Sequence, residues 1–179
     1  MQPEGQRICL QTLTIIFMED QRSKLVDISN QNILVDADGF VAIVKEDDAN
    51  HEKARQYYSR IDTLPVNLIT TNYVIAEAIT VISQRVSHEV AVDFIATVTA
   101  EPSPITILDI DNTFVRKKAI PLFKSQKSKN VSFVDCINMA VLKEHNCLCI
   151  FSFDAAYKTN GFTLIEDFLE SRSELSSHS

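Results

Sequence analysis

Apolar residues follow two different spacings along the middle of this chain, and the two spacings alternate. The run Ile33-Leu34-Val35 stops at Asp36, which is typical of a buried strand. The segment 72–86 instead carries isoleucine and valine at helical spacing. Further helices are expected at 50–61, from Ser87 through Val98, around 114–122 with an end or kink at Pro121, and at 132–145. Further strands are expected at 105–110 and 147–153.

This alternation predicts the fold class. Strands interleaved with helices imply βα units, a central parallel sheet and a three-layer α/β/α sandwich. Ligands gather at the carboxyl ends of the strands in such sheets. Asp36 and Asp154 each come just after a predicted strand, so both are expected at that edge.

The two ends of the chain differ from its middle. Residues 1–31 are interpreted as an N-terminal extension of uncertain structure, residues 32–168 as one folded domain, and residues 169–179 as a polar, frayed tail. The apolar stretch Ile8–Met18 is short and interrupted by polar residues, and no cleavage pattern follows it. It is interpreted as a strand or an appendage, and a cytoplasmic protein without a membrane partner is expected.

Composition narrows the function classes. The 179 residues suffice for one domain with a core, and 45% hydrophobic and 23% charged residues are ordinary for a soluble globular protein. Three glycines cannot build a Gly-rich phosphate-binding loop, which excludes that kind of nucleotide site. The four cysteines form no CxxC pair and no Cys/His metal spacing, so they are expected to pack as small apolar residues.

Charge is distributed unevenly. The net charge of −7 argues against binding nucleic acid through bulk charge. The segment 112–134, however, contains no acidic residue and six basic ones, so it carries +6 and the rest of the chain −13. Such a segment is either a solvated helix face or a binding surface for a polyanion. The six candidate RNA-binding residues are Arg116, Lys117, Lys118, Lys124, Lys127 and Lys129.

Two strand ends carry acids that allow two interpretations. Asp36 and Asp38 flank Ala37 directly after the first strand, where they could set a turn or together bind Mg²⁺. Asp154 follows the last strand and could likewise form a turn or project from the edge of the sheet.

Two helices carry the other candidate acids. Asp135 stands three residues after Ser132, which fits a capping box and is compatible with a functional role at a helix N-terminus. Glu77 faces roughly opposite the apolar stripe of the 72–86 helix, where an exposed glutamate is common. Pattern alone does not assign a function to any one of these acids.

Taken together, these segments resemble the PIN domain family over about Asn32 to Phe168. Each motif is short, but their order and spacing are fairly specific. Four of the matching segments carry one acid each: 33–40 with Asp36, 70–77 with Glu77, 132–135 with Asp135 and 152–157 with Asp154. The last of these is similar to T-x-D-x-x-F. A fifth segment, 48–54, has the pattern D-x-x-H-x-x-A.

The resemblance implies that four acids converge around one or two Mg²⁺ or Mn²⁺ ions and that the protein hydrolyses RNA phosphodiester bonds by means of a metal-activated water. Asp36, Asp135 and Asp154 would be direct or water-mediated ligands. Glu77 would hold the water shell of the metal or orient the attacking water. Ser152 would add a hydrogen bond or only end the strand, and Asp38 would be an auxiliary fifth acid.

Length and architecture are also similar to those of the toxins of VapBC-type toxin–antitoxin pairs. This resemblance implies an RNA substrate, an antitoxin protein as inhibitor and a homodimer. An extension of about 30 residues before the domain is unusual for such a toxin.

Two alternatives stay open. Asp36-Ala37-Asp38-Gly39 also resembles the start of haloacid dehalogenase-like phosphatases, in which the first Asp is the nucleophile. The chain lacks that family's later Lys and Asp-Asp arrangement and an obvious cap domain. The second alternative is a PIN-like fold that serves as a non-catalytic binding module.

Overall fold

Four parallel strands form the central sheet of the computed structural model, which describes residues 28–177. Their order is β3-β2-β1-β4, with β1 (Gln31–Val35) between β2 (Val66–Thr71) and β4 (Cys147–Phe151) and with β3 (Thr106–Leu108) at one edge. The parallel sheet and the α/β class confirm the expected architecture. The predictions for residues 1–27, including the Ile8–Met18 stretch, lie outside the described residues.

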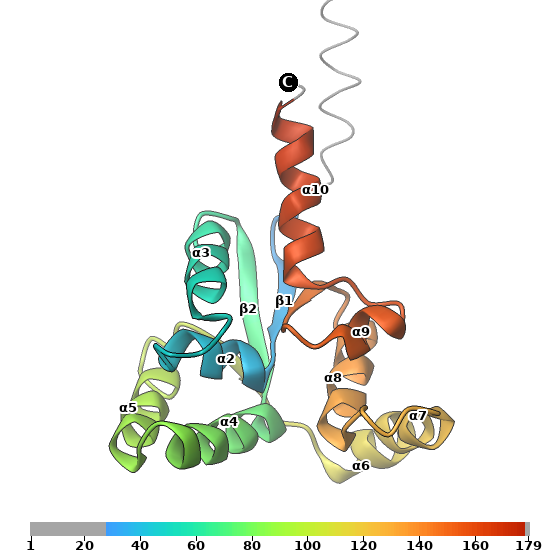
Figure 1. Cartoon of the computed structure of the whole chain (residues 1–179). Coiled ribbons are helices and arrows are strands. Elements are labelled where there is room, and N and C mark those ends of the chain that lie inside the picture. Colours follow the sequence, from blue (N-terminus) through green and yellow to red (C-terminus); the bar gives the residue numbers. More distant parts are fainter. Residues whose placement is uncertain (1–27, 178–179) are drawn as a thin grey trace, which may run out of the picture.

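Helices cover both faces of the sheet (Figure 1). Successive side chains of β1 point to opposite faces: Ile33 and Val35 join one apolar cluster, and Leu34 joins the other. All three are buried, as expected for a strand covered on both faces. The first cluster includes residues of α2 (Ala37–Val44), α3 (His51–Ile61), α4 (Asn72–Arg85), α5 (His88–Val98) and α10 (Ile165–Ser177), and the second includes residues of α6 (Asn112–Phe114), η1 (Val115–Ala119), α7 (Ile120–Ser125), α8 (Phe133–Glu144) and α9 (Ala155–Thr159).

Helices α3, α4, α5 and α8 begin and end close to where the sequence predicts. Ser87 caps α5, and its Oγ accepts a hydrogen bond from the backbone N–H of Val90 at 3.1 Å. The strand expected at 105–110 is shorter in the structure, because β3 pairs with β2 only over residues 106–108. Strand β2 and helices α2, α9 and α10 were not predicted.

Helix α2 begins directly after β1, where a turn was one of the two interpretations of the sequence. Asp36 is its N-cap, so Asp38 lies in its first turn and not in a loop. Gly39 explains how this helix fits against the sheet. A Cβ atom at Gly39 would lie 2.7 Å from the backbone oxygen of Phe151, so only glycine permits this close approach to β4.

Pro121 neither ends nor kinks the helical segment in the way expected. Helical structure runs from Asn112 to Ser125, and the stretch Val115–Ala119 before the proline is a π-helix. Pro121 then occupies the first turn of α7, where a missing backbone N–H is tolerated.

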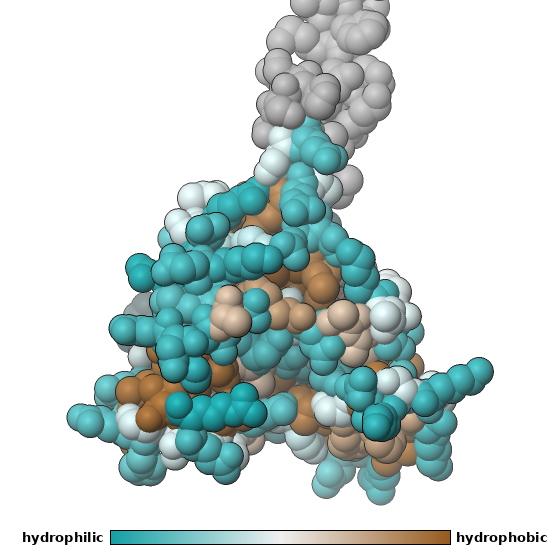
Figure 2. All heavy atoms as spheres, in the orientation of Figure 1, coloured by the Kyte–Doolittle hydropathy of each residue, from teal (hydrophilic) through white to brown (hydrophobic). Residues whose placement is uncertain are grey.

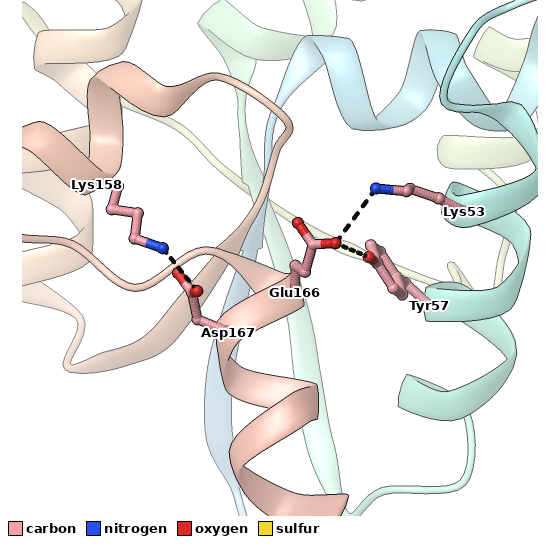
Figure 3. A network of polar contacts seen from close by, with 5 residues as sticks. All are labelled: Lys53, Tyr57, Lys158, Glu166 and Asp167. Atoms are coloured by element: carbon pink, nitrogen blue, oxygen red, sulfur yellow. Dashed lines mark hydrogen bonds and ion pairs between the residues drawn. The ribbon is translucent and has the colours of Figure 1, made fainter.

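Polar contacts join the C-terminal helix α10 to α3 and α9 (Figure 3). Tyr57 donates a hydrogen bond of 2.9 Å to Glu166, which also pairs with Lys53 at 3.3 Å, and Lys158 pairs with Asp167 at 2.8 Å. The helix continues to Ser177 and so passes through the boundary expected at residue 168. Residues 169–177 are therefore helical, which corrects the expectation of a frayed tail. Leu169 is buried in the first cluster, so the start of this segment packs against the core.

No helix in the range 28–177 is both long enough and apolar enough to span a membrane.

Candidate active site

Two of the expected acids cap the helices that come next after two strands. Asp36 follows β1, and its Oδ1 accepts a hydrogen bond from the backbone N–H of Ala37 at 2.8 Å. Asp154 follows β4, and its Oδ1 accepts from the backbone N–H of Ala156 at 2.7 Å. Asp36 is buried and Asp154 is exposed. Both therefore lie at the carboxyl edge of the two adjacent strands β1 and β4, as expected.

Asp135 forms the capping box that the sequence predicts. The backbone N–H of Ser132 donates to its Oδ2 at 2.6 Å, and its own backbone N–H donates to the Oγ of Ser132 at 3.0 Å. The residue is nevertheless buried, which is unusual for an acid that only caps a helix. Its other carboxylate oxygen, Oδ1, lies 3.2 Å from the hydroxyl of Tyr157.

Tyr157 and Asn138 connect Asp135 to Asp36. The hydroxyl of Tyr157 lies 2.8 Å from Oδ2 of Asp36, and Nδ2 of Asn138 donates to Oδ1 of Asp36 at 2.9 Å. Nδ2 of Asn138 also donates to the Tyr157 hydroxyl at 3.0 Å. All four side chains are buried. Residues that are more than 100 positions apart in the sequence thus form one polar network.

Asp38 is held by the segment after β4. Its Oδ2 accepts hydrogen bonds from the Ser152 hydroxyl at 3.0 Å and from the backbone N–H of Phe153 at 2.7 Å. The same hydroxyl accepts from the backbone N–H of Asp154 at 3.1 Å, so Ser152 links the two acids. Oδ1 of Asp38 is buried and has no hydrogen-bond partner.

Burial and like charge raise the pKa values of these carboxyl groups. Burial, followed by the charge of Asp38, raises the pKa of Asp36 from 3.8 to about 7, against the lowering effect of the hydrogen bonds from Ala37 and Tyr157. Burial also raises the pKa of Asp38 to about 6, with a smaller contribution from the charge of Asp154. Each acid therefore disfavours the charged form of its neighbour.

Glu77 belongs to the same electrostatic group. It is half-buried on α4, and its pKa is raised by burial and then by the charges of Asp36 and Asp135. The helical wheel alone predicted an ordinary exposed side chain. Tertiary packing instead places Glu77 near the buried acids.

None of the ion pairs in the described part of the chain involves these five acids. A set of carboxylates with no basic partner suits a hard divalent cation such as Mg²⁺ or Mn²⁺, and Oδ1 of Asp38 is a buried oxygen available as a ligand. Within residues 28–177, however, no three His, Cys, Asp or Glu side chains are arranged to hold a metal ion as they stand. Several of the carboxylate oxygens face hydrogen-bond donors of the protein instead.

The basic segment divides into two groups in the structure. Lys118 pairs with Glu144 at the C-terminal end of α8, so the 116–118 group lies at the end of α8 opposite Asp135. Phe123 packs edge-on against Phe133, with ring centroids 5.5 Å apart, which brings the end of α7 to the start of α8. The other three lysines, at 124, 127 and 129, lie at the end of α7 or on the loop that leads to Ser132.

The structure adds two site residues that the sequence analysis missed. Asn138 is a polar residue within an apolar run and stands three positions after Asp135 on the same helix face. That signal was available in the sequence. Tyr157 lies within the segment that matches the fourth motif, but nothing in the sequence indicates that its hydroxyl points toward Asp36.

Comparisons with known proteins identify the family and the fold of this chain. The model of the PIN domain family matches residues 33–162. The 23S rRNA-specific endonuclease VapC20 of Mycobacterium tuberculosis, in strains CDC 1551 / Oshkosh and ATCC 25618 / H37Rv, is 24% identical over 130 residues, which cover 73% of this chain and 95% of VapC20. The crystal structure of M. tuberculosis VapC20, a sarcin–ricin loop cleaving toxin, has a TM-score of 0.66 at 22% identity and covers 73% of this chain and 96% of that one. The match removes the haloacid dehalogenase-like alternative, and we conclude that this chain belongs to the PIN domain family.

Proposed function

We propose that this protein is a metal-dependent endoribonuclease that acts as the toxin of a type II toxin–antitoxin pair. The observation that carries the proposal is the group of buried acids at the carboxyl edge of the sheet, whose charge no basic side chain of the described residues offsets. Such a group is costly to fold, and a cation with its phosphate substrate would offset that cost. Family membership supports the same function.

Each acid has a proposed role. Asp36, Asp135 and Asp154 hold Mg²⁺ or Mn²⁺ directly or through water, and Asp38 is an auxiliary ligand through its unpartnered Oδ1. Glu77 is half-buried beside them and orients the attacking water. A bound cation would polarise the phosphodiester and lower the pKa of a bound water. Ser152 holds Asp38 in place through its hydroxyl.

The proposed substrate is a structured ribosomal RNA. The similar protein VapC20 is a 23S rRNA-specific endonuclease and a toxin that cleaves the sarcin–ricin loop. In this chain, three lysines at the end of α7 and on the loop that leads to Ser132 offer charges for the RNA backbone. These residues are Lys124, Lys127 and Lys129, and Arg116, Lys117 and Lys118 would contact RNA farther from the cleaved bond.

The cleavage assay uses purified protein with intact ribosomes, with a sarcin–ricin loop hairpin and with an unrelated hairpin. Each substrate is incubated with Mg²⁺, with Mn²⁺ or with EDTA. We expect a single cut in the presence of metal and none with EDTA. A folded protein that cuts no RNA under any condition would favour the alternative of a non-catalytic PIN-like binding module.

A protein partner is the second part of the proposal. A cavity of about 320 Å³ opens beside α5 and is lined mostly by apolar side chains, and Val92 and Ile95 of the same helix are exposed. Figure 2 shows apolar atoms gathered at the lower left, where Figure 1 draws α5. An exposed apolar surface of this kind is typical of a protein interface, and we assign it to an antitoxin or to a second copy of the chain.

Two measurements separate these partners. Light scattering of the isolated protein gives its oligomeric state, and a homodimer is expected. Co-expression with the product of a small neighbouring gene should give a stable complex that no longer cuts RNA. A monomer that co-purifies with no such product would remove the toxin–antitoxin part of the proposal but not the nuclease part.

A further inference from the structure

The hydroxyl of Tyr157 lies between two of the acids that the proposed function uses. We propose that Tyr157, supported by Asn138, is a positioning residue that sets the distance between Asp36 and Asp135 for metal binding. The inference rests on the proposed function, because the metal is what the two carboxylates are positioned for.

The hydrogens available to Asn138 and Tyr157 make the arrangement specific. Nδ2 of Asn138 has two hydrogens, and both are used, one toward Asp36 and one toward the Tyr157 hydroxyl. That hydroxyl has a single hydrogen but two carboxylate oxygens within reach, at 2.8 Å on Asp36 and at 3.2 Å on Asp135. It can donate to only one of them at a time, and the shorter contact favours Asp36.

The orientation of Asn138 follows from the same network. If its amide were reversed, the carbonyl oxygen would face Oδ1 of Asp36, and two acceptors would repel each other. In the observed orientation the amide oxygen is buried and has no partner, which is an energetic cost. The protein accepts this cost while keeping both N–H groups directed at the site.

The ring of Tyr157 does not need its hydroxyl in order to pack. Tyr157 is fully buried in the apolar cluster between α8 and the sheet, and a phenylalanine would fill the same volume. A buried hydroxyl is costly unless it is bonded, and the described partners of this one are only Asp36, Asp135 and Asn138. The hydroxyl therefore serves the carboxylates.

The consequence concerns metal affinity. Groups that orient a metal-binding carboxylate typically change affinity or activity by roughly 10- to 100-fold when they are removed. In Tyr157→Phe, Asp36 and Asp135 lose the group that connects them, and one Asn138 hydrogen loses its acceptor. We expect Mn²⁺ to bind roughly 10- to 100-fold more weakly.

Isothermal titration calorimetry with Mn²⁺ on the full chain tests this, with Tyr57→Phe as the matched control. Tyr57 also donates its hydroxyl to a carboxylate, Glu166, but outside the site. Circular dichroism and thermal unfolding check that each variant is folded. If Tyr157→Phe does not fold, Asn138→Ala serves as the test variant. It is expected to weaken Mn²⁺ binding in the same way.

The expected pattern is weaker Mn²⁺ binding and a higher half-saturating Mn²⁺ concentration for cleavage in Tyr157→Phe, with a smaller loss of rate at saturating Mn²⁺. Tyr57→Phe should match the wild type in both. If the wild type binds Mn²⁺ and cuts RNA while Tyr157→Phe binds Mn²⁺ as well as Tyr57→Phe does, the inference alone is overturned. If the wild type neither binds Mn²⁺ nor cuts RNA, the proposed function fails, and the inference fails with it.

Discussion

Glu166 on α10 and Asp36 after β1 are both acids with a tyrosine hydroxyl within hydrogen-bonding distance, yet their pKa values move in opposite directions. Tyr57 lies 2.9 Å from Glu166, and Tyr157 lies 2.8 Å from Asp36. The pKa of Glu166 is lowered by Tyr57 and Lys53, whereas burial and Asp38 raise the pKa of Asp36 to about 7. Figure 3 shows the first setting, in which each acid has a lysine partner.

The difference separates a structural use of acids from a functional one. The α10 contacts are exposed and electrically balanced, and such pairs contribute little to stability. At the candidate site Asp36 and Asp135 are buried and none of the five acids has a basic partner among the described residues, which opposes folding of the metal-free chain. We propose that the fold retains these destabilising charges because they bind a metal ion.

Removing an acid of the candidate site should therefore lower the rate of RNA cleavage, whereas removing an acid of α10 should not. We expect Asp36→Asn or Asp135→Asn to lower the rate of RNA cleavage by at least about 100-fold, because each removes a metal-binding charge. Glu166→Gln should cleave at the wild-type rate. Initial rates on the same RNA with saturating Mn²⁺ measure both. Equal cleavage by Asp36→Asn and the wild type would contradict the proposed mechanism.

Stability should change in the opposite sense. Asp36→Asn removes a buried charge, and its new amide can donate to the Tyr157 hydroxyl, which is then free to donate to Asp135. We expect the metal-free variant to unfold at a higher temperature than the wild type at pH 8, by about 2–4 °C for each kcal/mol gained. Calorimetry in EDTA measures this. A lower Tm would show that the ionised carboxylate stabilises the fold.

The pH dependence of the metal-free protein gives a third contrast. Because the pKa values of Asp36 and Asp38, about 7 and about 6, exceed their ordinary value of 3.8, the folded state binds more protons than the unfolded state between about pH 4 and pH 7. The free energy of unfolding therefore falls as the pH rises through this window. We expect a higher Tm at pH 5.5 than at pH 8 in EDTA.

Addition of Mn²⁺ should narrow the pH difference by stabilising the protein more at pH 8, where the carboxylates are ionised. In the Asp36→Asn variant the pH difference itself should be smaller. A wild-type Tm that rises steadily from pH 5.5 to pH 8 would refute the raised pKa values.

The smallest effect is expected at α10. Glu166→Gln breaks an exposed pair with Lys53, and we expect the Tm to change by no more than about 2 °C, with a loss that disappears at high salt. A large loss of stability would mean that these contacts hold α10 in place, and the comparison between the two regions would then weaken.

Local sequence signals predicted much of the fold. The caps at Ser87 and Ser132 and the apolar spacing of α4 depend on residues a few positions apart, so they could be identified without the tertiary structure. Helix α2 was missed because Asp36 and Gly39 are also typical turn residues. Gly39 is needed there only because the backbone of Phe151 lies against it, and no local pattern contains that contact.

The site divides in the same way. The sequence by itself determined the α/β class, the family and the positions of the acids at strand ends and helix starts, because spacing and capping are local properties. Only the tertiary structure showed that Tyr157 and Asn138 connect Asp36 to Asp135, and that packing half-buries Glu77, which the helical wheel leaves exposed and only the family resemblance placed with the other acids. Burial and hydrogen bonds between distant segments depend on how the layers pack. A side chain therefore acquires its electrostatic surroundings only once the layers have packed.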